Sequence, residues 1–266
     1  MAVLYLLHGC CDGYASWTRS TDVEALSAGS DILVVMPDGG RVGFYSNWVH
    51  GPRWETFHLI ELRQLLEQAF RAGTRRAVAG VSMGGLGAID YATYQPRLFC
   101  AAASYSGLLN TLGDGGQNAR DLLGLIASEG ENPTALWGDP RADAARWAAH
   151  NPYDVAEGLR GTALFVAGGN GQPGAFDPAS AGPDGVEQFV HRQTADFVRR
   201  IIDLRIPATI DLYGLGTHTW PYWQRELHRS WPLLTTALGI RASGAGTATP
   251  VDPATRRAGA PGCGTS

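Results

Sequence analysis

Short apolar runs alternate with longer amphipathic segments along most of this 266-residue chain, and this alternation restricts the fold more than any other feature. Most of the short runs are apolar on both faces, as in a parallel sheet that helices cover on both sides. The six predicted strands are residues 2–7, 31–37, 75–82, 98–106, 162–169 and 207–214. Helical periodicity marks residues 54–70 and 185–204. The sequence therefore predicts an α/β fold with a mostly parallel sheet flanked by helices.

One segment interrupts the alternation. Residues 107–160 contain helical patterns and no strand pattern, which predicts a helical insertion or lid after the fourth strand. Residues 241–266 are rich in Gly, Ala, Thr and Pro without an apolar period, so we expect a disordered tail there. We therefore expect one domain over residues 1–240 that contains the insertion.

Charge and composition exclude several functional classes. The 21 Lys and Arg against 25 Asp and Glu give a net charge of −4 without a basic cluster, so no nucleic-acid partner is expected. No apolar run approaches the ~18 residues of a membrane span, and no signal peptide is recognisable. The cysteines lack metal-ligand spacing, so we expect free thiols and neither a metal nor an organic cofactor. They are Cys10, Cys11, Cys100 and Cys263.

The segment VAGVSMGGLGA, residues 78–88, places Ser82 in a Gly-x-Ser-x-Gly frame. A predicted strand ends just before Ser82 and a helical pattern follows, as a nucleophile elbow requires. Gly80 and Gly84 leave room for the sharp turn, and the helix N-terminus favours negative charge beside the serine. Ser82 is the candidate nucleophile; the alternative is a glycine-rich turn that Ser82 only caps.

The order nucleophile, acid, base along the chain then directs the search for the other catalytic groups. His218 follows the last predicted strand, in GLGTHTWPYW, where the general base is expected. The acid should follow the strand at 162–169, and the residues alone favour Asp177 in the loop over Asp184 or Glu187.

Two backbone N–H groups are needed to hold an oxyanion. Met83, directly after the nucleophile, supplies one of them. Cys10, in the loop LLHGCC after the first strand, supplies the other, and Gly9 lets the backbone turn there. The Cys10 side chain is not needed, and no neighbouring group activates Cys10 or Cys11 as a nucleophile.

Ten segments, in order over most of residues 4–235, resemble the esterase group of the α/β-hydrolase fold that includes the antigen 85 mycolyltransferases. They are YLLHG, VVMPDGG, FYSNW, WETF, GVSMGG, SYSG, LWG, NPYD, GGNGQP and GTHTWPYW. The resemblance implies the roles given above for Ser82, His218, Cys10 and Met83. It also implies a catalytic glutamate at Glu187, because EQFVHRQTADF (187–197) matches the family pattern. Asp177 remains the alternative acid.

The chain also departs from the family pattern. His8 stands where trehalose-binding members carry an Asp, and Cys10 and Cys11 stand where those members have Leu and Arg. The sugar-contacting side chains are therefore not carried over. The family's N-terminal antiparallel strands lack a counterpart, so the first strand is expected at an unprotected sheet edge. By resemblance the protein would be secreted if a leader is missing from this sequence.

The expected function is hydrolysis of a carboxylic ester through an acyl-serine intermediate. The alternatives are acyl transfer to a sugar or lipid alcohol and a non-catalytic binding role. The expected partner is a small-molecule or lipid ester, and the sequence does not indicate an oligomeric state. Aromatic residues of the loops are candidates for substrate binding: Tyr45, Trp48 and Trp220. Motif position puts Tyr45 and Trp48 nearer the pocket than Trp220.

Overall fold

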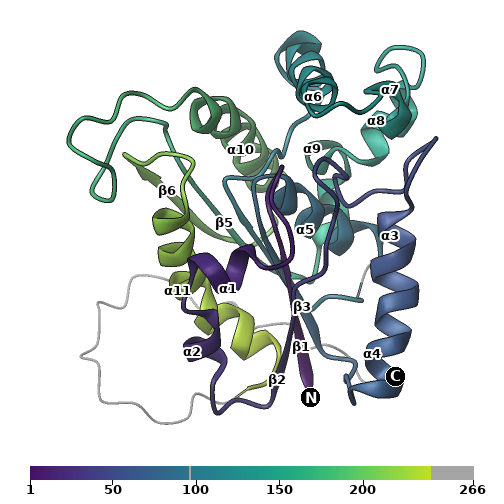
Figure 1. The fold of residues 1–266 in the computed structure, drawn as a ribbon, viewed down its shortest axis with the longest axis vertical. Coiled ribbons are helices and arrows are strands. Elements are labelled where there is room, and N and C mark those ends of the chain that lie inside the picture. Colours follow the sequence, from purple (N-terminus) through teal and green to yellow (C-terminus); the bar gives the residue numbers. More distant parts are fainter. Residues whose placement is uncertain (96, 241–266) are drawn as a thin grey trace.

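A computed structural model describes residues 1–95 and 97–240. Its centre is a six-stranded sheet in the order β2-β1-β3-β4-β5-β6, with every neighbouring pair parallel (Figure 1). The strands are β1 (Ala2–Leu7), β2 (Ile32–Val35), β3 (Arg76–Val81), β4 (Ala101–Tyr105), β5 (Ala163–Gly169) and β6 (Thr209–Gly214). The predicted α/β fold is confirmed. The tail expected at 241–266 lies outside the described residues.

The expectation of an unprotected edge at the first strand is wrong. β1 lies inside the sheet, because β2 pairs with its outer side in the register Ala2↔Ile32 to Tyr5↔Val35. A β-strand exposes its ladder groups only when one side has no neighbour. Within the described residues the sheet therefore ends at β2 and β6.

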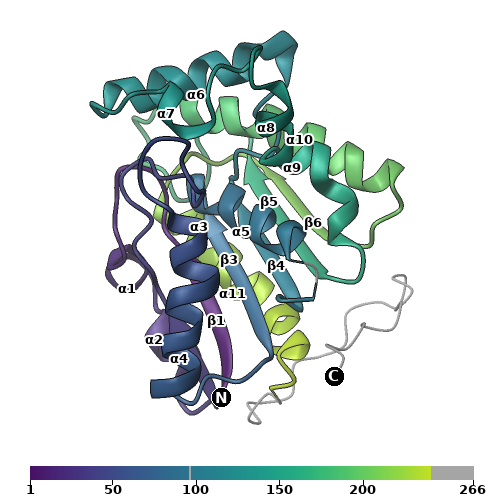
Figure 2. The same ribbon diagram turned by 90° about the vertical axis from the view of Figure 1, so that its right-hand side faces the viewer.

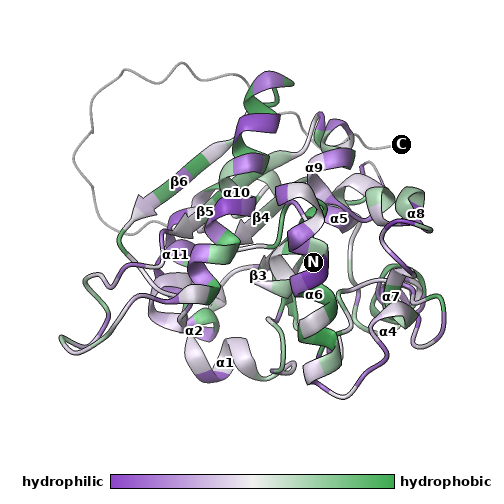
Figure 3. Ribbon diagram, turned by 90° about the horizontal axis from the view of Figure 1, so that it is seen from above, coloured by the Kyte–Doolittle hydropathy of each residue, from purple (hydrophilic) through white to green (hydrophobic). Residues whose placement is uncertain are grey.

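Helices cover both faces of the sheet. One core contains side chains of α4 (Arg63–Ala69), α5 (Met83–Tyr94) and α10 (Gly185–Asp203). The other core contains side chains of α1 (Ser16–Ser20), α2 (Val23–Ser27) and α11 (Trp220–Ala237). Along β1, Val3, Tyr5 and Leu7 join the first core and Ala2, Leu4 and Leu6 the second, because successive strand residues point to opposite faces. Figure 3 shows hydrophobic and hydrophilic bands alternating along α10, as expected for a helix with one face on the sheet.

The predicted helix at 54–70 is present with an irregularity. It begins as α3 (Trp54–Thr56), continues as a π-helical turn, η1 (Phe57–Leu62), and ends as α4. Such π turns are rare and short within α-helices. No helix in the described ranges is long and apolar enough to cross a membrane.

The segment between β4 and β5 is helical throughout its ordered elements. These are η2 (Asp114–Gly116), α6 (Gln117–Ser128), α7 (Thr134–Trp137), α8 (Ala144–Ala149), α9 (Pro152–Val155) and η3 (Ala156–Leu159). Figure 2 shows α6, α7 and α8 beyond the end of the sheet that lies opposite the N-terminus. Since β1 starts at the N-terminus and all strands are parallel, these helices lie at the carboxyl ends of the strands. A lid role for this insertion stays a prediction.

Candidate active site

Ser82 occupies a strained turn between β3 and α5. Its φ of 53° and ψ of −119° lie outside the usual regions for a residue with a side chain. Gly80 and Gly84 make this turn possible. A Cβ on Gly80 would lie 2.1 Å from the carbonyl oxygen of Gly84, and a Cβ on Gly84 would lie 2.3 Å from that of Leu7. The two glycines therefore let α5 start directly against the ends of β3 and β1.

The loop after β1 passes close to the serine. A Cβ on Gly9 would lie 3.3 Å from the Ser82 Cβ, so the loop and the elbow are in contact. The N–H groups of Cys10 and Met83 donate no hydrogen bond to another described residue. Met83 is the first residue of α5, where the helix leaves N–H groups unpaired. Both groups are therefore available to a negatively charged oxygen.

Glu187 and His218 form a hydrogen-bonded pair. The Glu187 Oε2 lies 2.6 Å from the His218 Nδ1. Its Oε1 accepts from the Ser106 hydroxyl at 2.8 Å and from the Gly169 N–H at 2.7 Å. Glu187 is fully buried, and these donors satisfy the carboxylate without water. Because the Nδ1 proton is directed at the carboxylate, the other ring nitrogen of His218 is left to accept a proton.

Asp184 connects Glu187 to His218 through hydrogen bonds from the backbone of each residue. Its Oδ1 caps α10 by accepting from the N–H groups of Val186, at 2.9 Å, and Glu187, at 3.1 Å. Its Oδ2 accepts from the His218 N–H at 2.8 Å. One side chain thus fixes both the first turn of α10 and the loop that carries the base.

The imidazole of His218 also rests against an aromatic ring. The Trp223 ring packs edge-on at 4.8 Å between centroids, and its Nε1 donates to the Ser106 hydroxyl at 3.1 Å. Ser106 is therefore held between Trp223 and Glu187. The sequence pattern predicts no role for Ser106, although the segment SYSG that resembles the family contains it.

Asp177 lies in a different hydrogen-bond network. Its carboxylate accepts from the hydroxyls of Thr217 and Tyr222 and from the Gly174 N–H. Burial works to raise the pKa of Asp177, but the hydrogen bonds from Thr217 and Tyr222 outweigh it and lower the pKa. Asp177 therefore stabilises its own loop, whereas Glu187 is the carboxylate that contacts His218.

A cavity of about 460 Å³ adjoins these groups. Ser82, His218, Gly9 and Cys10 line it, so the elbow, the base and the loop after β1 meet at one space. Its walls are mostly apolar side chains: Leu108, Leu125, Val186, Phe189, Val190, Trp220 and Trp223. The shape and lining suit an apolar group attached to a reactive carbonyl.

The expected order of the aromatic residues is reversed. Trp220 lines the cavity, whereas Tyr45 and Trp48 do not. Tyr45 is fully buried and donates from its hydroxyl to the His8 carbonyl at 2.9 Å. The indole Nε1 of Trp48 donates to the Gly43 carbonyl at 3.0 Å. Both side chains are buried, and their polar atoms donate to backbone carbonyls instead of facing the cavity.

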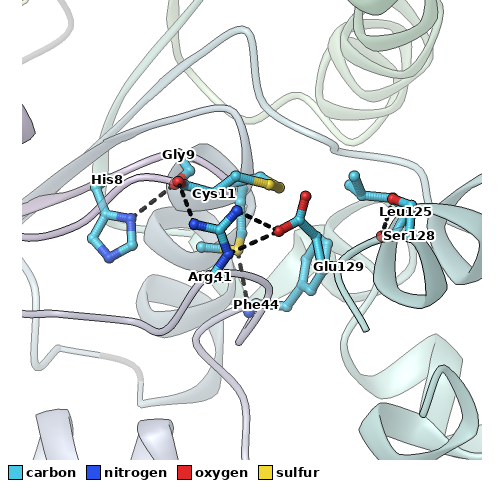
Figure 4. Close-up of a disulfide and its surroundings, with 10 residues drawn as sticks. His8, Gly9, Cys11, Arg41, Phe44, Leu125, Ser128 and Glu129 are labelled. Carbon is cyan, nitrogen blue, oxygen red and sulfur yellow. Dashed lines mark hydrogen bonds and ion pairs between the residues drawn. A yellow bond between two sulfur atoms is a disulfide. The ribbon is translucent and has the colours of Figure 1, made fainter. Parts of the chain in front are cut away.

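The Cys10–Cys11 pair is joined by a disulfide (Figure 4), so the expectation of free thiols is wrong for this pair. Figure 4 shows Arg41 between Cys11 and Glu129, the residue that follows α6. The Arg41 guanidinium donates to the Glu129 carboxylate at 2.6 Å and to the Cys11 carbonyl at 3.4 Å. The Cys11 N–H donates back to the Arg41 carbonyl at 2.8 Å. The loop after β1 is thereby connected to the end of α6.

His8 does not face the cavity. Its ring is fully buried, accepts from the Gly39 N–H at 2.8 Å through Nε2 and lies 2.8 Å from the Gly9 carbonyl through Nδ1. These partners fix the tautomer, with the proton on Nδ1. The His8 side chain thus connects the loop after β1 to the backbone at Gly39.

Comparison with known proteins gives a family. The family model described as "Putative esterase" matches residues 1–234. Esterase Rv1288 of Mycobacterium tuberculosis is 36% identical over 217 residues, which cover 77% of this chain and 46% of the relative. This chain thus spans about half the length of that relative.

Two further relatives match over more of their length. The diacylglycerol acyltransferase/mycolyltransferase Ag85B of Mycolicibacterium smegmatis is 32% identical, with 89% of this chain and 77% of the relative covered. The crystal structure of Mycobacterium tuberculosis MPT51 (FbpC1) superposes with a TM-score of 0.77 at 26% identity and covers 89% of each chain. The chain therefore belongs to the esterase family of the α/β-hydrolase fold, as the resemblance predicted.

Proposed function

We propose that the protein is a serine carboxylic ester hydrolase that works through an acyl-serine intermediate. The observation that carries the proposal is the buried Glu187–His218 pair at a cavity that Ser82 also lines. A base oriented by a buried carboxylate beside a strained serine is the arrangement that activates a hydroxyl for nucleophilic attack.

In the first half-reaction, His218 takes the proton of the Ser82 hydroxyl while the Ser82 Oγ attacks the ester carbonyl carbon. The N–H groups of Cys10 and Met83 stabilise the negative charge that develops on the carbonyl oxygen. The C–O bond to the alcohol then breaks, and His218 gives its proton to the leaving alcohol. Glu187 stabilises the histidine cation in between and remains ionised.

In the second half-reaction, His218 takes a proton from water as the water oxygen attacks the acyl carbon. The acyl–serine bond breaks, the carboxylic acid leaves, and Ser82 regains its proton from His218. The apolar walls of the cavity, including Leu125 and Phe189, favour an ester whose acyl part is apolar.

A second candidate is acyl transfer, in which an alcohol takes the place of water. The similarity to the mycolyltransferase Ag85B favours it. The different residues at His8, Cys10 and Cys11 favour hydrolysis instead, and the His8 ring is turned away from the cavity towards Gly39. Supplying sugar or lipid alcohols to the acyl-enzyme and measuring ester product against free acid separates the two.

The enzyme proposal is tested with a chromogenic short-chain ester. Ser82→Ala should lower kcat by about 10⁶-fold, because the variant lacks the hydroxyl that attacks the ester carbonyl. Ser27→Ala, in α2 away from the cavity, should retain wild-type turnover. A fluorophosphonate should label Ser82, as read by peptide mass spectrometry.

Absence of turnover in the wild type would favour a non-catalytic binding role. Turnover unchanged in Ser82→Ala, or a label on another residue, would refute the assignment of the nucleophile.

A further inference from the structure

Three side chains that can ligate a metal ion meet beside α5, outside the cavity that contains Ser82. Glu55 comes from α3, Asp90 from α5 and His150 from the residue after α8. One ligand atom of each lies within 4.8 Å of those of the other two. None of the three lines the cavity that contains Ser82.

The cluster is buried, and one of its carboxylate oxygens has no hydrogen-bond partner among the described residues. Glu55 is 6% exposed and Asp90 is 2% exposed. The Asp90 Oδ2 lies 3.1 Å from the His150 Nδ1, whereas its Oδ1 is buried without a hydrogen-bond partner among the described residues. A buried carboxylate oxygen with no partner is costly unless a cation takes that place.

We propose that Glu55, Asp90 and His150 bind one divalent metal ion of the zinc type. An imidazole nitrogen with two carboxylate oxygens is a donor set that Zn²⁺ accepts, usually with a fourth ligand such as water. Ligands about 2.0–2.1 Å from a tetrahedral zinc lie about 3.4 Å apart. The Asp90 Oδ2 and the His150 Nδ1 are 3.1 Å apart, which is already close to this value. Glu55 completes the set by a small movement of its flexible side chain.

The surroundings support a site that is built in advance. The His150 ring stacks on Trp137 with 4° between planes and 5.2 Å between centroids, which fixes its orientation. A ring held in this way loses little freedom when it binds a metal. Zn²⁺ would displace the proton between His150 and Asp90 and neutralise the two carboxylates.

The place of the site in the fold gives it a structural role. His150 belongs to the insertion between β4 and β5, whereas Asp90 lies on α5, the helix that follows Ser82. A metal held by both residues fastens the insertion to the helix of the nucleophile elbow. Since the site is separate from the cavity, its role is to stabilise the fold, and ester turnover should change by less than about twofold on zinc addition.

The test uses wild type, Glu55→Gln and His150→Gln, each stripped with a chelator and titrated with Zn²⁺ by calorimetry. Wild type should bind one Zn²⁺ per chain, and each variant should bind at least tenfold more weakly. His228→Gln removes another histidine–carboxylate pair, with Asp22 on the surface, and should bind as wild type does. At a Zn²⁺ concentration that just saturates wild type, the Tm of wild type should rise by about 5 °C or more, and the Tm of both variants should rise by less.

Co²⁺ provides a readout that does not depend on turnover or stability. Bound in place of Zn²⁺, it should give the visible d–d bands of a nitrogen–oxygen site in wild type and in His228→Gln only. Circular dichroism shows whether the two ligand variants are folded. If His150→Gln does not fold, Glu55→Gln still tests the proposal. Wild-type affinity in both ligand variants, or equal loss in His228→Gln, would overturn the proposal.

Discussion

Glu187 shows how much a single buried carboxylate depends on its donors. It is withdrawn from solvent but accepts from Ser106 and Gly169 on one oxygen and faces His218 with the other. Hydrogen bonds of this kind offset the cost of burying a polar side chain. In the proposed mechanism this carboxylate stabilises the imidazolium of His218.

Exchanging this carboxylate for an amide is therefore a sharp test of the acid. We expect Glu187→Gln to lower kcat by about 10⁴-fold, because the amide cannot stabilise the cation or hold the same tautomer. Asp177→Asn is the matched change in the same part of the chain, and it should lower kcat by less than about tenfold. Steady-state kinetics with the chromogenic ester measures both. A near-normal rate for Glu187→Gln together with a large loss for Asp177→Asn would reverse the assignment.

Residue patterns reached some of the site and missed other parts for physical reasons. Ser82 and His218 stand out because an elbow needs glycines at fixed positions and the base follows the last strand. The choice of Glu187 over Asp177 needed the family resemblance, because several acidic residues follow β5. Ser106 carries no local pattern for its role, since its partners Glu187 and Trp223 are distant in sequence.

At the scale of elements, the contact between α5 and the sheet depends on glycine. The Cβ positions of Gly80 and Gly84 are filled by backbone atoms, which cannot rotate away as a side chain could. The strand-to-helix pattern predicted these elements well, because their faces are apolar and their turns have strict requirements. The positions of Tyr45 and Trp48 were not predictable from the sequence. The local sequence around an aromatic loop residue is similar whether its ring packs into the core or lines a ligand site.

Two glycines with opposite surroundings make a matched prediction. Gly84→Ala places a Cβ 2.3 Å from the Leu7 carbonyl, so α5 must shift. We expect a loss of about 1–3 kcal/mol in the free energy of unfolding together with reduced kcat. Gly124→Ala, on an α6 position where a Cβ meets nothing within 4 Å, should instead gain about 0.4–1 kcal/mol. Urea unfolding followed by fluorescence measures both, and equal effects would contradict this account of the packing.

At the scale of the whole molecule, a buried histidine couples the stability of the fold to pH. The His58 Nδ1 lies 2.8 Å from the Tyr91 hydroxyl and its Nε2 lies 2.8 Å from the Asp38 carbonyl. Both contacts are satisfied by a neutral ring with its proton on Nε2. Burial lowers the pKa of His58 from 6.5 to about 4. Between these values the unfolded chain binds a proton that the folded chain does not.

Stability should therefore fall as the pH drops from 6.5 towards 4. The pKa difference corresponds to a loss of about 3 kcal/mol over that window. His58→Gln should be less stable than wild type at pH 7, and its free energy of unfolding should fall less than that of wild type on acidification. Urea unfolding at several pH values measures the difference between the two proteins, with His228→Gln as a control that behaves like wild type. The same acid slope in His58→Gln as in wild type would contradict the prediction.

The comparison with the variant is needed because another group acts in the opposite direction. Burial raises the pKa of Glu226 to about 7, so its contribution to stability is present below pH 4.5 and is lost as the pH rises through 7. The measured profile of the wild type is the sum of such contributions. Only the difference between wild type and His58→Gln isolates the histidine.

The double contact of Asp184 couples the position of His218 to the start of the helix that carries Glu187. Its carboxylate caps α10 and holds the backbone of His218 at the same time. A fluctuation that lifts the base away from Glu187 must give up a hydrogen bond of the residue that starts the helix of the acid. Misalignment of His218 alone is thereby disfavoured, because the Asp184 carboxylate links the backbone of His218 to the first turn of α10.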